Sequence, residues 1–135
     1  MLTLAPGILD EIVEHAKSCY PAEGCGLITG SAASMTGIRF IPMANVAQSA
    51  AEFEMAPAEL IKVLKDLRNA DERLLAIYHS HPHGPDRPSK TDVERAYYPE
   101  AAHLIISLAE RERPRVVGFR IIDGEILEIE VHAIV

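Results

Sequence analysis

The chain has 135 residues, 48% of them hydrophobic, and a formal net charge of −7 at pH 7. This length is sufficient for one domain, residues 1–135, with a core that needs no disulfide support. The hydrophobic content excludes a disordered chain. Binding to a phosphate backbone needs clustered Lys and Arg, and the sequence has no basic stripe, so we expect no nucleic acid partner.

The N-terminal segment MLTLAPGILDEIVEHAKSCYPAEG does not resemble an export signal, because it lacks a positive start and acidic residues interrupt its apolar positions. No apolar run approaches the roughly 18 residues that a membrane span needs, so we expect no membrane partner. Cys19 and Cys25 do not make a disulfide framework. We therefore expect a cytoplasmic protein with reduced thiols.

The first half of the chain predicts two helices and three strands. A helix over residues 6–20 follows from apolar side chains that recur every four residues, and Pro21 ends it. A second helix over residues 57–70 begins at Pro57 and has leucines on one face. The strands predicted between these helices are 24–30 (GCGLITG), its antiparallel neighbour 38–46 (IRFIPMANV) and 52–55 (EFEM).

The second half of the chain predicts mainly strands. Residues 73–81 (RLLAIYHSH) have the apolar density of a central strand, and residues 89–98 are typical of a short helix. The dipeptide Asp123-Gly124 predicts a hairpin turn. Because the order is mixed and ends in consecutive strands, we expect the α+β class. The closing strands are predicted at 103–109, 115–122 and 125–135.

Two histidines end the predicted central strand. His79 and His81 are separated by one residue, so on a strand they point to the same face with Cα atoms roughly 6.5–7 Å apart. Two imidazoles at that spacing can converge on one metal ion. The alternative is a pair of exposed histidines at a strand end.

A stiff loop and a helix start follow the histidine pair. Ser89 and Asp92 have the spacing of a capping box, in which each residue satisfies a backbone N–H of the other. If the loop instead folds the helix start beside the strand end, Asp92 points at the histidines. Two nitrogens and one oxygen would then leave a fourth position open, which is the pattern of a catalytic zinc site. The residues alone leave both interpretations open.

Two segments of the sequence resemble one known family. HSHP followed by six residues, Ser89, two residues and Asp92 is similar to the signature of the JAMM (MPN-plus) zinc metalloproteases, and PAEGCGLITG resembles their Glu-x-Cys-Gly-Leu segment. The resemblance implies that His79, His81 and Asp92 are zinc ligands. It further implies that Glu23 is the catalytic acid and base and that Ser89 stabilises the oxyanion. Without the family pattern, nothing distinguishes Glu23 from the other acidic residues.

The resemblance also implies a fold and a reaction. The fold is a mixed, partly barrelled central sheet flanked by helices, with a cytidine-deaminase-like architecture. The reaction is hydrolysis of a peptide or isopeptide bond at the C-terminal tail of a ubiquitin-like or sulfur-carrier protein, and the short chain resembles the compact bacterial and archaeal members. The alternative is a non-catalytic MPN scaffold or protein-interaction module. A zinc deaminase is excluded, since it needs a Cys-x-x-Cys pair that the chain lacks.

Three residues near these motifs have more than one interpretation. Cys25 is expected to be a small apolar filler, with a fourth ligand or a nucleophile as the alternatives. His83 is expected in the loop after the histidine pair rather than in the site. Asn45 is expected either to bind substrate backbone or to stabilise a turn. The sequence does not identify the carrier protein, the group released or the oligomeric state.

Overall fold

The computed structural model describes residues 1–135 and contains three helices and nine strands. In chain order these elements are β1 (Leu2–Leu4), α1 (Ile8–Cys19), β2 (Cys25–Ser31), β3 (Thr36–Gly37), β4 (Arg39–Met43), α2 (Pro57–Asn69), β5 (Glu72–His81), α3 (Lys90–Glu94), β6 (Ala102–Ser107), β7 (Arg115–Ile122), β8 (Glu125–Ile129) and β9 (Val131–Ala133). No helix has the length and apolar character needed to cross a membrane.

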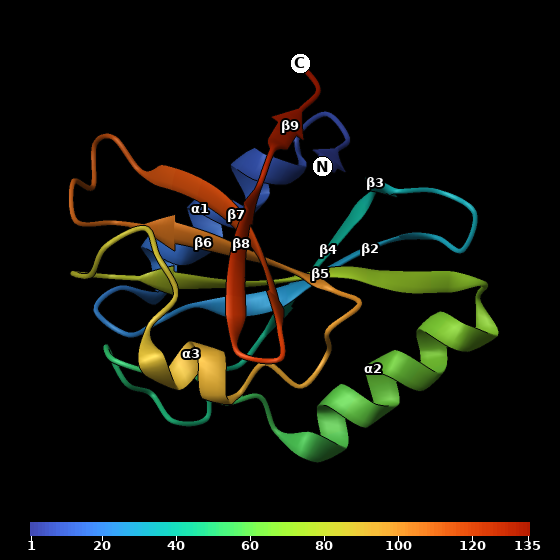
Figure 1. Ribbon diagram of the computed structural model, residues 1–135, viewed down its shortest axis with the longest axis horizontal. Helices are drawn as coiled ribbons and strands as arrows, with labels where there is room; N and C mark the ends of the chain where they lie inside the picture. Colours follow the sequence, from blue (N-terminus) through green and yellow to red (C-terminus); the bar gives the residue numbers. More distant parts are fainter.

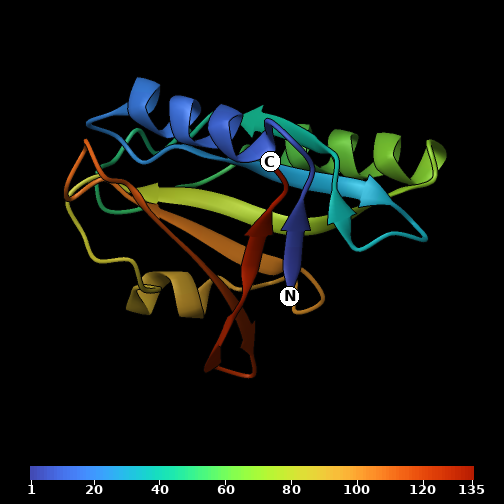
Figure 2. The same ribbon diagram turned by 90° about the horizontal axis from the view of Figure 1, so that it is seen from above.

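The strands form two sheets. The larger has the order β4-β2-β5-β6-β7-β8, in which only the central pair β5 and β6 is parallel. The smaller, β3-β1-β9, is parallel, and Figure 2 shows β1 and β9 side by side near the two termini. The α+β class with a mixed sheet is confirmed. The expected partial barrel is not formed, because the chain leaves β8 and pairs β9 with β1, so that β4 and β8 stay open edges.

The two faces of the larger sheet are covered by different helices. Ile12 of α1 belongs to the same buried cluster as Tyr78, whereas Leu60 of α2 packs on the cluster around Ile77. Tyr78 and Ile77 are neighbours on β5 and therefore point to opposite faces. In Figure 1, α1 lies behind β6 and β7, whereas α2 and α3 lie below the central strands. His79 has the same parity as Ile77, which places it on the side of α2 and α3.

The predicted strand at residues 52–55 is wrong. Its alternating side chains resemble a strand, but its backbone groups find partners outside any ladder. The Glu52 carbonyl accepts from the Asn45 side chain, the Glu54 N–H donates to that same side chain, and the Glu54 carbonyl accepts from Val46. A single amide side chain thus replaces part of the strand pairing that the pattern predicted.

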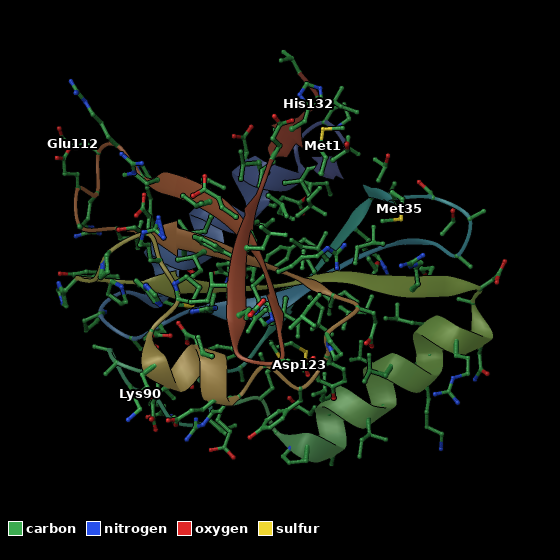
Figure 3. All side chains as sticks on the ribbon, viewed as in Figure 1. Met1, Met35, Lys90, Glu112, Asp123 and His132 are labelled. Atoms are coloured by element: carbon green, nitrogen blue, oxygen red, sulfur yellow. The ribbon has the colours of Figure 1, made fainter.

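The C-terminal segment departs from its prediction in one respect. Residues 125–135 were expected as one strand, but the chain breaks at Glu130 and divides between the two sheets as β8 and β9. The hairpin before it is confirmed: Asp123 and Gly124 have φ of 52° and 80°, the positive values that a type I′ turn requires. Figure 3 labels Asp123 at the tip of this hairpin.

Candidate functional site

Three predicted metal ligands meet at the end of β5. Nε2 of His79 lies 3.0 Å from Nε2 of His81, and Oδ2 of Asp92 lies 3.0 Å and 3.1 Å from these two atoms. All three residues are buried. The strand parity explains why the imidazoles share a face, and the loop between β5 and α3 returns the helix start to the same place.

Each imidazole is held by a second contact. The Nδ1–H of His81 donates to the carbonyl of Pro85 at 2.7 Å, which leaves Nε2 of that ring as the nitrogen with a free lone pair. The ring of His79 stacks on Phe53, with centroids 4.7 Å apart and planes at 24°. The Nδ1 atom of His79 is buried without a partner. Both rings therefore direct Nε2 toward Asp92.

Asp92 forms the capping box that its sequence context predicted, and its Oδ2 also faces the histidine pair. Its Oδ2 accepts the Ser89 backbone N–H at 2.8 Å, and the Ser89 hydroxyl accepts the Asp92 N–H at 3.1 Å, which completes a capping box on α3. Lys90, at the start of the same helix, extends outward to the periphery of the molecule (Figure 3). Burial raises the pKa of Asp92, but the adjacent His79 and His81 outweigh burial and hold that pKa well below its usual range.

Glu23 lies beside the histidine pair, immediately before β2. One of its carboxylate oxygens and one ring nitrogen of each histidine lie within 4.8 Å of one another. The residue is buried, and its Oε1 has no hydrogen-bond partner. Burial raises the pKa of this carboxyl to about 8, while the nearby His81 lowers it. A carboxyl group with such a pKa can exchange a proton near neutral pH.

The donor set fits a divalent cation. Ligands bound tetrahedrally at 2.0–2.1 Å lie about 3.3 Å apart, close to the observed 3.0–3.1 Å between the three atoms. Without a cation, the two facing nitrogens of His79 and His81 depend on a single shared proton. Two imidazole nitrogens and one carboxylate oxygen are also ligands that zinc accepts.

A cavity of about 440 Å³ opens beside the site. His79 and Asp92 form part of its wall, so a molecule in this cavity touches the candidate metal ligands directly. Arg95 and His103 also line it, and Nε2 of His103 is buried without a partner. The rest of the lining is largely apolar and aromatic and includes Phe53, Met55, Leu60, Ile77, Tyr97 and Tyr98.

Apart from His79 and Asp92, sequence reasoning missed the residues of this cavity. Nothing in the sequence marks His103, which stands outside the motifs. In the structure β6 runs parallel to β5 with His103 opposite Ile77, which puts it on the same face as His79. Only the pairing of the two strands supplies that information. Phe53 was missed because its segment was predicted as a strand.

Three further residues have clear positions. Cys25 is fully buried within the smaller core cluster, and burial raises the pKa of its thiol to about 12, as expected for an inert filler. His83 is exposed and packs edge-on against Tyr20, at 5.3 Å between centroids, rather than against the histidine pair. Asn45 uses its side chain within the chain itself, bonding to the backbone of residues 23, 47, 52 and 54.

The sequence and the structure both resemble known proteins. The CysO-cysteine peptidase of Mycobacterium tuberculosis is 32% identical over 134 residues, which cover 99% of this chain and 92% of that protein. The desampylase of Haloferax volcanii is 35% identical over 111 residues, 78% of this chain and 80% of that protein. A protein from Desulfitobacterium hafniense, solved in solution, superposes with a TM-score of 0.87 at 36% identity and covers 98% of this chain and 92% of its own.

A family model provides the assignment. The model for prokaryotic homologs of the JAB domain matches residues 6–120, a range that contains Glu23, the histidine pair and Asp92. The chain therefore belongs to the prokaryotic JAB-domain family.

Proposed function

We propose that this protein is a zinc metallopeptidase that hydrolyses a peptide or isopeptide bond at the C-terminal tail of a ubiquitin-like or sulfur-carrier protein. The relatives that support this reaction are named CysO-cysteine peptidase and desampylase. The observation that carries the proposal is the convergence of His79, His81 and Asp92 within 3.1 Å, with the buried carboxyl of Glu23 beside them. The active unit is one domain, residues 1–135.

Two carboxylates flank the histidine pair, and their distances suggest different roles. Asp92 lies at ligand spacing from both nitrogens, whereas Glu23 lies farther away, within 4.8 Å. We assign Asp92 with His79 and His81 as the metal ligands. The greater separation of Glu23 leaves room for a water molecule between this carboxyl and the ligands. Zinc held here would supply Lewis acidity, polarising the scissile carbonyl and making water acidic enough to attack it near neutral pH.

Glu23 is assigned the proton transfers. Its unpaired Oε1 is free to accept a proton from the attacking water and to return it to the departing amine. A carboxyl group with a raised pKa suits both steps, because neither its charged nor its neutral form is strongly favoured near neutral pH. The proton-transfer role that the family resemblance implies for Glu23 is thus supported by a carboxyl group that faces the histidine pair without lying at ligand distance.

Ser89 is assigned to the oxyanion. Its hydroxyl oxygen accepts the Asp92 N–H, but it donates to no protein atom. A hydroxyl group carries one proton and two lone pairs, so this proton remains free for a developing negative charge. The capping contact fixes the oxygen beside the ligand carboxylate and therefore near the scissile carbonyl.

The substrate lies across the site and the adjoining cavity. His79 and Asp92 belong to the cavity wall. The part of the substrate that enters the cavity is therefore the part next to the scissile peptide bond. The lining favours an apolar or aromatic group with a polar atom near His103. The non-catalytic scaffold remains the second candidate, and it predicts a folded protein that cleaves nothing.

The test compares Glu23→Gln with the parent chain and with Glu11→Gln, an exposed position on α1. Each protein is loaded with zinc and incubated with a CysO–cysteine conjugate and with ubiquitin-like carriers joined to a lysine peptide. The parent and Glu11→Gln should cleave at least one conjugate, while Glu23→Gln should bind about one zinc and lose roughly 10²–10⁴-fold in rate. A zinc-loaded parent that cleaves no conjugate would favour the scaffold.

A further inference from the structure

The loop between β4 and α2 lies over the segment that carries Glu23. It closes on itself through a hydrogen bond of 2.9 Å from the Val46 N–H to the Glu54 carbonyl. Its Ser49 carbonyl accepts the Glu23 N–H at 2.8 Å. The loop also brings Phe53 onto the ring of His79. One loop therefore contacts both the candidate acid and base and one of the candidate ligands.

Asn45 is the residue that organises this loop. Its Nδ2 donates to the carbonyls of Glu23 and Glu52, both at 3.1 Å, and its Oδ1 accepts from the N–H groups of Ala47 at 3.1 Å and Glu54 at 3.0 Å. A side-chain amide offers two donors and one oxygen with two lone pairs. All four are used, and all four partners are backbone groups. This occupancy excludes Asn45 as a contact for substrate backbone unless the loop first opens.

The backbone of Glu23 is held on both sides. Its N–H is fixed by Ser49 and its carbonyl by Asn45. Its carboxylate has no comparable support, because Oε1 has no partner at all. The position of the carboxylate is consequently set by its own backbone and by packing, and hence by the loop that grips that backbone.

We propose that Asn45 is a positioning residue for Glu23: its side chain ties the Glu23 carbonyl to the loop that also stacks on His79, and so aims the carboxylate at the metal site. The inference rests on the proposed function. A carboxylate that moves by about 1 Å loses its alignment for proton transfer, which costs on the order of 10²-fold in rate. Substrate binding and metal ligation use other residues, so KM and zinc content should change little.

Three substitutions separate this role from simple loop closure. Asn45→Ala removes all four hydrogen bonds. Asn45→Asp keeps the two accepted bonds, from Ala47 and Glu54, but cannot donate to Glu23 or Glu52. Ser49→Ala is the matched control within the same loop: it removes only the local bond from the Ala51 N–H to the Ser49 hydroxyl and keeps the Ser49 carbonyl on Glu23.

The measurements are kcat, KM and zinc content of the zinc-loaded full chain on a conjugate that the parent cleaves. We expect both Asn45 variants to lose on the order of 10²-fold in kcat with KM within about threefold of the parent. Ser49→Ala should stay within about threefold in both constants. If Asn45→Asp has the kcat of the parent, closure of the loop alone is sufficient for full activity and the inference is wrong. Should Asn45→Ala fail to fold, the Asn45→Asp result decides alone.

A double substitution tests whether Asn45 acts through Glu23. Glu23→Asp shortens the carboxylate and removes the alignment that Asn45 provides, so adding Asn45→Asp to it should cost less than threefold more. A further loss near 10²-fold in kcat would mean that the two effects are additive, and would show that Asn45 acts independently of Glu23. The proposed function fails separately, if the zinc-loaded parent cleaves no conjugate or if Glu23→Gln matches the parent.

Discussion

Oδ2 of Asp92 accepts the Ser89 backbone N–H at 2.8 Å and lies 3.0 Å from Nε2 of His79. The helix cap and the candidate metal site thus share one atom. Capping and ligation were alternatives in the sequence, but they are compatible in space, because a carboxylate oxygen has more than one lone pair. The cap orients the side chain, and this orientation places Oδ2 beside the histidine pair.

Substitutions at Asp92 should separate the two roles. Asn in place of Asp92 keeps an oxygen for the Ser89 N–H but loses the negative charge, so Asp92→Asn should fold normally and lose most of its zinc. Asp92→Ala removes the cap as well. It should lower the free energy of unfolding of the metal-free protein by about 1 kcal/mol more than Asp92→Asn does. Zinc analysis and urea denaturation measure the two effects.

The control for Asp92 is Glu94→Gln, at an exposed position on the same helix. It should leave both zinc content and stability unchanged. A zinc content for Asp92→Asn equal to that of the parent would remove Asp92 from the ligand set.

Metal removal should destabilise the protein. Zinc that binds only the folded chain stabilises it by about 3 kcal/mol when free zinc is a hundredfold above Kd. A chelator should therefore lower Tm of the parent by several degrees, and added zinc should restore it. The variant His79→Ala with His81→Ala should show no such response, which scanning calorimetry can check. An equal response in parent and double variant would place the metal elsewhere.

The packing around Gly24 leaves no room for a side chain. A Cβ there would overlap the Tyr78 hydroxyl and lie 3.3 Å from Cys19 Sγ. Gly24→Ala should therefore cost about 1–3 kcal/mol of unfolding free energy by overpacking. Adding Tyr78→Phe removes the overlapping oxygen, so the Gly24→Ala cost should fall by at least about 0.5 kcal/mol in that background.

Gly30 provides the matched control for this cycle. A Cβ at Gly30 would overlap the Thr36 carbonyl and lie 2.8 Å from Leu75 Cδ1, on the same strand but opposite Arg73 rather than Tyr78. Gly30→Ala should be destabilising, with no relief from Tyr78→Phe. Equal relief at both glycines would mean that Tyr78→Phe acts through general loosening of the core.

His103 should make stability depend on pH. Burial, followed by the charge of His79, lowers the pKa of His103 from 6.5 to about 4. Below pH 6.5 the unfolded chain takes up a proton that the folded chain refuses until about pH 4. As the pH is lowered from 6.5 to about 4, the free energy of unfolding should therefore fall by at most about 3 kcal/mol. Above pH 6.5 this loss should be absent.

The substitution His103→Leu isolates this contribution. The variant should equal or exceed the parent at pH 7, because it removes an unpaired buried nitrogen, and its advantage should grow between pH 6.5 and 4. Urea denaturation across that range measures the difference, with His132→Leu on the exposed side of β9 as the control. A difference that is constant with pH would contradict the shift.

Local patterns predicted the features that depend on local geometry. The strand parity of His79 and His81 and the capping box at Ser89 and Asp92 are properties of a few neighbouring residues, and both are found. The strand at 52–55 failed because Asn45, seven residues upstream of Glu52, satisfies its backbone groups. Nothing in an alternating pattern reveals a side chain that competes with strand pairing.

Features that depend on the order of the strands in the sheet could not be predicted from local sequence patterns. The position of His103 follows from the parallel pairing of β5 with β6, and β1 and β3 are too short to show a period. The place of Glu23 came from the family resemblance alone. The physical reason for choosing Glu23 is visible only in the structure, where its carboxylate lies beside the histidine pair and its Oε1 has no partner.

The cavity beside the site is lined by strands, helices and irregular segments. Ile77, His79 and His103 stand on the paired central strands, whereas Tyr97 and Tyr98 belong to the segment between α3 and β6, which carries none of the residues assigned to the chemistry. Exchange of that segment would thus offer a route to enzymes that accept new conjugates. The residues assigned to metal binding and proton transfer would be inherited unchanged, and only selectivity would be altered.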